Sequence, residues 1–344
     1  MSQLPPDGLL TSAPTRPHLP LARRAVVAAA LGLLFRSALL PRSGQAGEHG
    51  RWAEPMPLAA RSLLLDGTRQ GDRVIVVGER GHVLVSADGG RTWAQAKVPT
   101  RALLTAVTMV GSELTWAVGH GPVVLRSNDG GTNWVRQHLP ERAVGPLLDV
   151  WFADERQGIA IGAFGRIMAT EDGGDTWRAG VIDDKEPHAN AIVQSSEQTL
   201  YVAAEFGMLF ASIDVGRSWT TLDVPHGGSF FGILTLGDGS LLAYGLRGRL
   251  VRSSDGGLRW TTIETGSADT LLTGLLRHDG TVLLGGLRGS LLISRDGGLT
   301  FDAKRRTSRR AICALVDLLP RGILLLGEGG FEVVHDLNDF YVSS

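Results

Sequence analysis

Several residue types are scarce in this chain of 344 residues, and each scarcity narrows what the protein can be. The single cysteine, Cys313, lies in the apolar run 311–316, so a disulfide framework is impossible and we expect this residue to be a small core side chain. Nine histidines are dispersed without His-x-x-x-His or paired Cys/His spacing, which predicts no metal site. A formal net charge of −1 provides no general attraction to nucleic acid or to an anionic membrane.

Familiar catalytic motifs are also missing. No Gly-x-Ser-x-Gly elbow lies between a predicted strand and a predicted helix. The glycine pairs of the sequence are not followed by a helix whose N-terminus would bind phosphate. We therefore expect no cofactor and no enzymatic nucleophile of these kinds.

The N-terminal region differs in composition from the rest of the chain. Arg23 and Arg24 precede an unbroken apolar stretch, residues 25–35, and small residues follow at 44–46. This order is typical of a secretory signal, and the stretch is too short for a comfortable membrane span. We expect residues 1–46 to be a signal peptide or N-terminal anchor and the protein to be exported, periplasmic or membrane-associated. Cleavage and the choice between the Sec and twin-arginine routes stay open.

One short sequence motif, which we call the repeated phrase, occurs six times in the remaining chain. It reads Ser/Thr-x-Asp-Gly-Gly-x-x-Trp, with Val215 replacing the first glycine of the fourth copy and Phe301 replacing the tryptophan of the sixth. Its aspartates are spaced 41, 43, 42, 41 and 41 residues apart, and they are Asp88, Asp129, Asp172, Asp214, Asp255 and Asp296. A period near forty, with alternating apolar strands inside each unit, is typical of a β-propeller.

A second repeated pattern indicates the number of blades. A strand, a glycine turn and another strand occur seven times, and the seventh copy, residues 323–334, has no phrase after it. Residues 51–55 resemble the outer strand 91–95 that follows the first phrase. We therefore predict an all-β, seven-bladed propeller over residues 47–336, closed by an N-terminal strand in which Trp52 completes the last blade, and a C-terminal tail, 337–344.

The repeated aspartates have a structural interpretation. An aspartate in a hairpin accepts hydrogen bonds from N–H groups of its own turn, and the following tryptophan buries a large area between blades. Six periodic carboxylates also raise the possibility of calcium, but each phrase holds only one and the six lie around a rim. We predict turns and no metal.

These units resemble the Asp-box (BNR) repeat of the Ycf48-like photosystem II stability/assembly factor family, most specifically over residues 149–177. The resemblance implies a seven-bladed propeller and a non-enzymatic scaffold that binds a membrane protein or complex, such as a photosystem subunit or a membrane transporter. In a photosynthetic cell it implies a thylakoid-lumen equivalent location. We expect a monomer that binds neither nucleic acid nor a small-molecule substrate.

In a propeller, the turns between second and third strands share a face with the blade connections, and that face usually binds ligands. Guanidinium groups on that face would bind the carboxylates of an acidic partner segment. The family that this chain resembles carries an arginine patch on its propeller. The candidates are Arg80, Arg101, Arg247, Arg249, Arg288, Arg305, Arg306, Arg309 and Arg310, with His82, His120, Arg142 and Arg166 nearby. Because the chain has 31 arginines and only three lysines, a merely compositional origin of this patch stays open.

Two other function classes stay open beside the scaffold. Sialidases also carry Asp boxes, but their chemistry needs a tyrosine nucleophile paired with a glutamate, and none of Tyr201, Tyr244 and Tyr341 has that setting. The Arg-Ile-Pro signature of sialidases is absent as well. A glycan-binding propeller would need exposed aromatic side chains, for which the candidates are Phe164, Phe206, Phe230 and Phe231.

Overall fold

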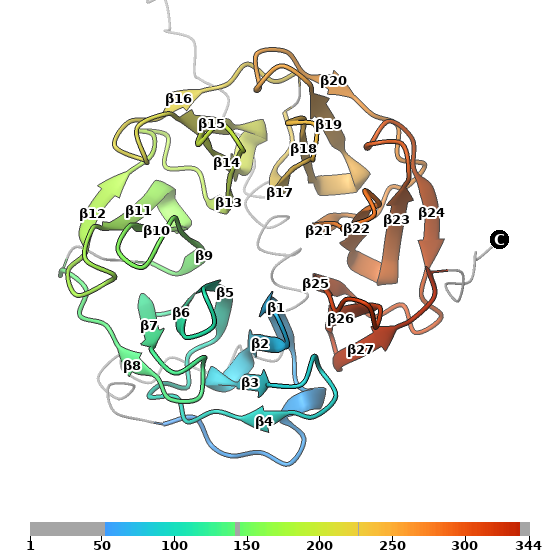
Figure 1. Ribbon diagram of the computed structural model, residues 1–344. Helices are drawn as coiled ribbons and strands as arrows, with labels where there is room; N and C mark the ends of the chain where they lie inside the picture. The colour runs from blue at the N-terminus through green and yellow to red at the C-terminus, as the bar shows by residue number, and fades with distance from the viewer. Residues whose placement is uncertain (1–51, 142–144, 226, 338–344) are drawn as a thin grey trace, which may run out of the picture. The chain divides into compact units, whose positions relative to one another are not determined.

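The computed structural model describes residues 52–141, 145–225 and 227–337. Within them, seven antiparallel sheets are arranged in a ring, and the first strand of each sheet lies nearest the centre of the ring (Figure 1). Six sheets have four strands and the last has three, which confirms the predicted seven blades. No helix among the described residues is long and apolar enough to cross a membrane.

The blades follow one another in chain order. Blades one to three comprise β1 (Leu64–Gln70), β2 (Arg73–Gly78), β3 (Val83–Ser86), β4 (Ala94–Gln95); β5 (Leu104–Val110), β6 (Leu114–Gly119), β7 (Val123–Ser127), β8 (Val135–Arg136); and β9 (Leu147–Phe152), β10 (Gly158–Gly162), β11 (Arg166–Thr170), β12 (Arg178–Val181). Blades four and five comprise β13 (Ala189–Gln194), β14 (Leu200–Ala204), β15 (Leu209–Ser212), β16 (Thr220–Thr221); and β17 (Phe230–Thr235), β18 (Leu241–Gly245), β19 (Leu250–Ser253), β20 (Thr261–Thr262). Blades six and seven comprise β21 (Leu271–Leu276), β22 (Val282–Gly286), β23 (Ser290–Ser294), β24 (Asp302–Arg305); and β25 (Ile312–Asp317), β26 (Ile323–Gly327), β27 (Gly330–Val334). Short 3-10 turns are η2 (Ala59–Arg61), η3 (Glu79–Gly81), η4 (Ala163–Gly165), η5 (Glu205–Gly207), η6 (Leu246–Gly248) and η7 (Leu287–Gly289).

The core lies between blades. Second strands such as β14 and β18 are buried along their whole length, because a neighbouring blade covers each face of the sheet. Between blades one and two, for example, Ile75 and Val77 pack with Leu104 and Leu125. Alternating apolar side chains on both faces of every sheet thus turn seven small sheets into one continuous ring of interfaces.

Polar side chains also join the innermost strands of successive blades. Each of these side chains bonds to a backbone group of the next blade's first strand, where an edge of the sheet would otherwise leave it unpaired. The four bonds are Asp66 Oδ2 accepting from the Val107 N–H (2.8 Å), Thr105 Oγ1 donating to the Leu147 carbonyl (2.8 Å), Asp149 Oδ2 accepting from the Ile192 N–H (2.8 Å), and Asn190 Nδ2 donating to the Phe230 carbonyl (2.7 Å).

The predicted closure by an N-terminal strand is wrong. Within the described residues blade seven has only β25, β26 and β27, and Trp52 is 55% exposed and belongs to no strand. Pro55 and Pro57 have no N–H to donate to a strand ladder. The segment instead lies along blade one, where the Ala53 N–H donates to the Val98 carbonyl at 2.8 Å.

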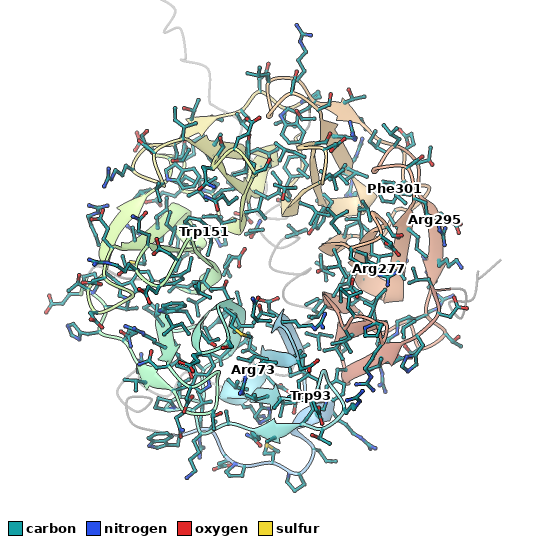
Figure 2. The ribbon with its side chains drawn as sticks, viewed as in Figure 1. Arg73, Trp93, Trp151, Arg277, Arg295 and Phe301 are labelled. Atoms are coloured by element: carbon teal, nitrogen blue, oxygen red, sulfur yellow. The ribbon has the colours of Figure 1, made fainter. Side chains whose placement is uncertain are left out.

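The ring closes through side chains. Valine and leucine side chains of β2 and β3 pack against those of β25 and β26 in one apolar cluster. Trp93 of the first Asp box lies with its ring centroid 4.8 Å from that of Phe331 in β27 (Figure 2 labels Trp93). Arg69 in β1 donates Nη1 to the Asp317 carbonyl and Nη2 to the Leu319 carbonyl, both at 3.1 Å. Apolar packing and charged donors therefore join blade one to blade seven without a shared strand.

Candidate functional site

The 3-10 turns and the blade connections meet on one face, which we call the turn face. In blade three, the Gly165 N–H donates to the Pro187 carbonyl (2.8 Å) and the Ile182 N–H donates to the Gly165 carbonyl (2.8 Å). In blade five, a Cβ at Gly248 would collide with the carbonyl oxygen of Ser267 in the connection to blade six. The predicted association of turns and connections therefore holds in both blades.

The Asp boxes lie on the opposite side, which we call the box face, beside the turns between first and second strands. The Gly89 N–H of the first box, for instance, donates to the Asp72 carbonyl at 2.7 Å. In box three, Asp172 accepts from the Thr176 N–H (2.9 Å), the Thr176 hydroxyl (2.6 Å) and the Thr170 hydroxyl (2.8 Å). These hydrogen bonds, with that of the Thr176 side chain foremost, lower the pKa of Asp172 to about 2.

The other five boxes repeat this arrangement. Each carboxylate accepts from the Ser or Thr hydroxyl two positions before it and from the N–H four positions after it, for Asp88, Asp129, Asp214, Asp255 and Asp296. Among the described residues, no three His, Cys, Asp or Glu side chains gather where they could hold a metal ion. The geometry gives these carboxylates a turn-forming role.

The boxes also receive a hydrogen bond from the preceding blade. In five boxes the carbonyl of the first glycine accepts from a side chain of that blade (Arg73 is labelled in Figure 2). The pairs are Arg73 with Gly130 (3.1 Å), Trp116 with Gly173 (2.9 Å), Tyr201 with Gly256 (2.9 Å), Arg252 with Gly297 (3.1 Å) and, across the closure, Arg321 with Gly89 (2.9 Å).

A left-handed residue forms the tip of each glycine turn on the turn face. Glycine occupies this position in blades two and seven, as Gly121 (φ 75°) and Gly329 (φ 81°). In the other five blades it is a larger, exposed residue whose left-handed backbone the sequence analysis did not predict: Arg80 (φ 57°), Phe164 (59°), Phe206 (61°), Arg247 (59°) and Arg288 (57°). A non-glycine residue in this conformation costs roughly 1–3 kcal/mol, and such strain concentrates at functional sites.

Five of the predicted arginines present exposed guanidinium groups on this face. Four have no ion pair within the described residues, and Arg288 lies 3.7 Å from Asp269 with 72% of its side chain exposed. We call them the open arginines: Arg247, Arg249, Arg288, Arg309 and Arg310. Blades five to seven therefore carry positive charge that is not neutralised inside the protein.

The remaining predicted arginines are placed differently. Arg101 pairs with Glu54 and donates Nε to the Trp52 carbonyl at 3.0 Å. Arg305 pairs with the buried Asp269, and Arg306 pairs with Glu332 and is 14% exposed. Arg80 is exposed, with Nη1 lying 3.8 Å from Met56 Sδ. Three of these four guanidinium groups are thus engaged in the protein's own ion pairs.

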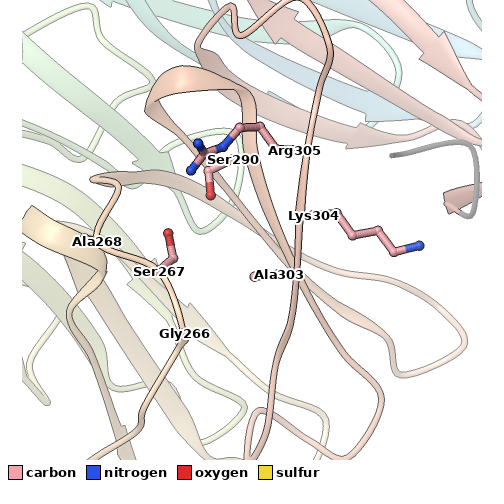
Figure 3. Close-up of a pocket in the computed structure, with 7 residues that line it drawn as sticks. All are labelled: Gly266, Ser267, Ala268, Ser290, Ala303, Lys304 and Arg305. Carbon is pink, nitrogen blue, oxygen red and sulfur yellow. The ribbon is translucent and has the colours of Figure 1, made fainter. Parts of the chain in front are cut away.

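Two shallow hollows flank the connection between blades five and six. One, of about 560 Å³, is lined by Arg247, Arg249 and residues 262–268. The other, of about 320 Å³, is shown in Figure 3, where Ser267, Ser290 and Arg305 lie around the hollow and the Lys304 side chain extends away. Lys304 Nζ donates to the Leu337 carbonyl at 3.1 Å. Of the open arginines, Arg247 and Arg249 thus line one of the two hollows.

The other candidates of the sequence analysis do not join this group. His82 is completely buried, both of its ring nitrogens lack a hydrogen-bond partner among the described residues, and burial lowers its pKa. Arg142 lies outside the described residues. Phe230 is buried, whereas Phe164 and Phe206 are 47% and 62% exposed.

The two described tyrosines are buried. The Tyr201 hydroxyl serves the box contact to Gly256, and burial raises the pKa of Tyr201. The Tyr244 ring lies against Gly232 and Gly274, and burial raises its pKa also. Neither hydroxyl is hydrogen-bonded to a glutamate within the described part of the chain, and Tyr341 lies outside it.

Comparison with known proteins gives one family and one fold. The family model of the photosynthesis system II assembly factor YCF48 matches residues 51–147 and 143–272. None of the curated proteins matches the chain.

Solved propellers are similar in structure. A structure of YCF48 bound to D1 peptide superposes with a TM-score of 0.69 at 20% identity, covering 86% of this chain and 100% of that one. YCF48 from Cyanidioschyzon merolae gives 0.66 at 20% identity, covering 82% and 97%. The WD40 β-propeller domain of Doa1 gives 0.64 at 14% identity, covering 83% and 94%. At these identities the similarity shows the fold.

Proposed function

This chain belongs to the family of the photosynthesis system II assembly factor YCF48, and from that premise we propose that it is a non-enzymatic propeller scaffold that assists the assembly or stability of a membrane protein. Its turn face would bind an extramembrane segment of that protein. The family relationship supports the class of function, and the partner is identified by its chemistry, as a segment rich in carboxylates.

The observation that carries the proposal is the set of open arginines. Arg247 and Arg288 are exposed and held in the left-handed conformation on adjacent blades, and Arg247 lines one of the two hollows. An arginine that only improved solubility would not need a strained backbone position. Planar guanidinium groups recognise carboxylates bidentately, so several of them exposed on one face suit an extended acidic segment.

The solved structure of YCF48 bound to D1 peptide supports a peptide-binding role for a propeller of this family. We extend that role to this chain without carrying over the peptide. The N-terminal composition supports export, to the periplasm or to a membrane-associated location, and we propose that the exported protein acts as a monomer.

The experiment is site-specific photo-crosslinking in intact cells. A photoreactive residue replaces the exposed Ala268, which lines both hollows, and a matched one replaces the exposed Ala87 on the box face. We expect position 268, and not 87, to crosslink to the same integral membrane protein in repeated experiments, and the crosslink to disappear in the R247E/R288E/R309E variant. A crosslink that survives the charge reversal, or sialidase turnover by the purified protein, would overturn the proposal.

A further inference from the structure

A second region of the turn face, on blades three and four, combines exposed apolar side chains with carboxylates. Phe164 at the tip of η4 is 47% exposed and Phe206 at the tip of η5 is 62% exposed. Val181, at the end of β12, is 46% exposed and contacts the position of Gly165. The connection between these blades carries three carboxylates. We call this set the aromatic–acidic sector: Phe164, Val181, Asp183, Asp184, Glu186 and Phe206.

The acidic connection is fixed between the two phenylalanine tips. On the blade-three side, the backbone N–H and carbonyl of Gly165 both bond to it, at 2.8 Å. On the blade-four side, Glu205 donates its N–H to the His188 carbonyl (3.0 Å) and accepts from the His188 N–H (3.2 Å) through Oε2. His188 Nδ1 lies 3.0 Å from the same Oε2. The carboxylates are therefore presented at a defined place on the surface.

The phenylalanine side chains have little structural reason to occupy these tips. Both residues have left-handed backbones, which glycine would adopt without strain, as Gly121 does at the matching position of blade two. Phe164 makes an edge contact to His188, with ring centroids 5.1 Å apart, and its ring lies beside Gly145, yet it remains half exposed. No ring contact with another described residue involves Phe206, and most of its ring faces solvent. Two adjacent blades thus each hold a large apolar side chain in solvent at a conformational cost.

We propose that the aromatic–acidic sector is a binding site for a polypeptide segment that is cationic and apolar. The two rings contact its aliphatic side chains and stack against its guanidinium or ammonium groups, while the carboxylates of residues 183–186 pair with the same cations. The connection carries one lysine, Lys185, and the half-buried Arg166 pairs in register with Val181, so the three carboxylates still outnumber the cations. An anionic bilayer does not fit, because its headgroups would face these carboxylates.

This site is opposite in charge to the open arginines on blades five to seven and does not depend on them. A segment with an acidic and a basic end would engage both regions at once, and a purely basic segment would engage only this one. The inference therefore stands or falls separately from the proposed function.

The test measures peptide binding to the full-length protein by fluorescence anisotropy. The probe is a short fluorescein-labelled peptide in which arginine and leucine alternate. We expect saturable binding that F164G/F206G weakens at least tenfold, while its melting temperature stays equal to or above that of the parent, because glycine relieves both left-handed residues. D184N/E186Q, which changes only exposed loop residues, should weaken binding and reduce its dependence on salt.

Matched controls distinguish this site from the open arginines and from a carbohydrate site. R247E/R288E/R309E should bind the peptide no more weakly than the parent, and a peptide with serine in place of leucine should bind several-fold more weakly. Equal binding by the parent and F164G/F206G would overturn the proposal, as would equal affinity for the leucine and serine peptides. Glycan binding lost in F164G/F206G, with no peptide binding by the parent, would overturn it in favour of a carbohydrate site.

Discussion

Arg321 of blade seven donates Nη1 to the carbonyl oxygen of Gly89 in the Asp box of blade one, 2.9 Å away across the closure of the ring. The same kind of contact joins Arg73 to Gly130 between blades one and two. The junction between the first and last blades is thus built like an ordinary junction between neighbours. Arg69 adds two further bonds from blade one to blade seven.

Removing these donors should weaken the closure. In R69M/R321M three charged hydrogen bonds to backbone carbonyls are lost, and such bonds contribute about 1.5–3 kcal/mol each, partly offset by relaxation. We expect the free energy of unfolding to fall by roughly 3 kcal/mol in urea denaturation. R91M, at an exposed arginine without an ion pair in the described residues, is the control and should change little. A double variant as stable as R91M would contradict the account of the closure.

The two tryptophans at matching sequence positions should behave differently on truncation. Trp134 of the second box is 3% exposed between blades one and two, and Trp134→Ala should cost about 3–5 kcal/mol, the usual range for a buried tryptophan. Trp52 is 55% exposed, so Trp52→Ala should cost less than about 1 kcal/mol. Thermal or urea unfolding distinguishes them. A large loss for Trp52→Ala would restore a strand-like role for the N-terminal segment.

The box carboxylates should make stability sensitive to acid. The folded pKa of Asp172 is about 2, below the value of about 4 in an unfolded chain, so its contribution is present above pH 4 and is lost as the pH falls towards 2. Asp172→Asn should therefore be less stable than the parent at pH 6, and the difference should shrink towards pH 2. A difference independent of pH across urea titrations would contradict a charged role for this carboxylate.

Asp66 should have the opposite pH dependence. Burial, with Asp149 nearby, raises its folded pKa to about 7, so ionisation opposes folding and stability should fall as the pH rises from about 4 to 7. The contribution of Asp66 to this slope is at most about 1.4 kcal/mol per pH unit. Burial also raises the folded pKa of Asp149 to about 7, so Asp149 adds a slope of the same sign. Asp66→Asn keeps an oxygen for the Val107 N–H and should reduce the total slope by about half. Asp184→Asn, at an exposed carboxylate, should leave it unchanged. A slope as steep in Asp66→Asn as in the parent would contradict the assignment.

The repeats determined most of the fold, because each unit carries its own strands, turn residues and apolar alternation. The repeats did not predict how blade seven joins blade one. Residues 51–55 resemble the segment that contains the outer strand Ala94–Gln95, but that strand is only two residues long. Pro55 prevents a longer strand from forming in the N-terminal segment. Contacts between residues hundreds of positions apart, such as Arg321 with Gly89, leave no local pattern.

The sequence predicted arginines on the turn face but not which of them are free of ion pairs within the described residues. Whether an arginine is available depends on an acidic residue elsewhere: Arg305 is neutralised by Asp269 and Arg306 by Glu332, 36 and 26 positions away. No spacing rule predicts such pairs. The left-handed tips are closer to being predictable, since a glycine turn contains one position that must adopt positive φ, but only the backbone shows that Arg247 or Phe206 occupies it.

The most direct measurement of the central claim is partner capture by the R247E/R288E/R309E variant, compared with the parent and with thermal unfolding of both. All three side chains are exposed, and their one ion pair within the described residues is the 3.7 Å contact of Arg288 with Asp269, so the melting temperature should change little. We predict that the variant loses the membrane protein that the parent captures. Unchanged capture by a folded variant would contradict the account.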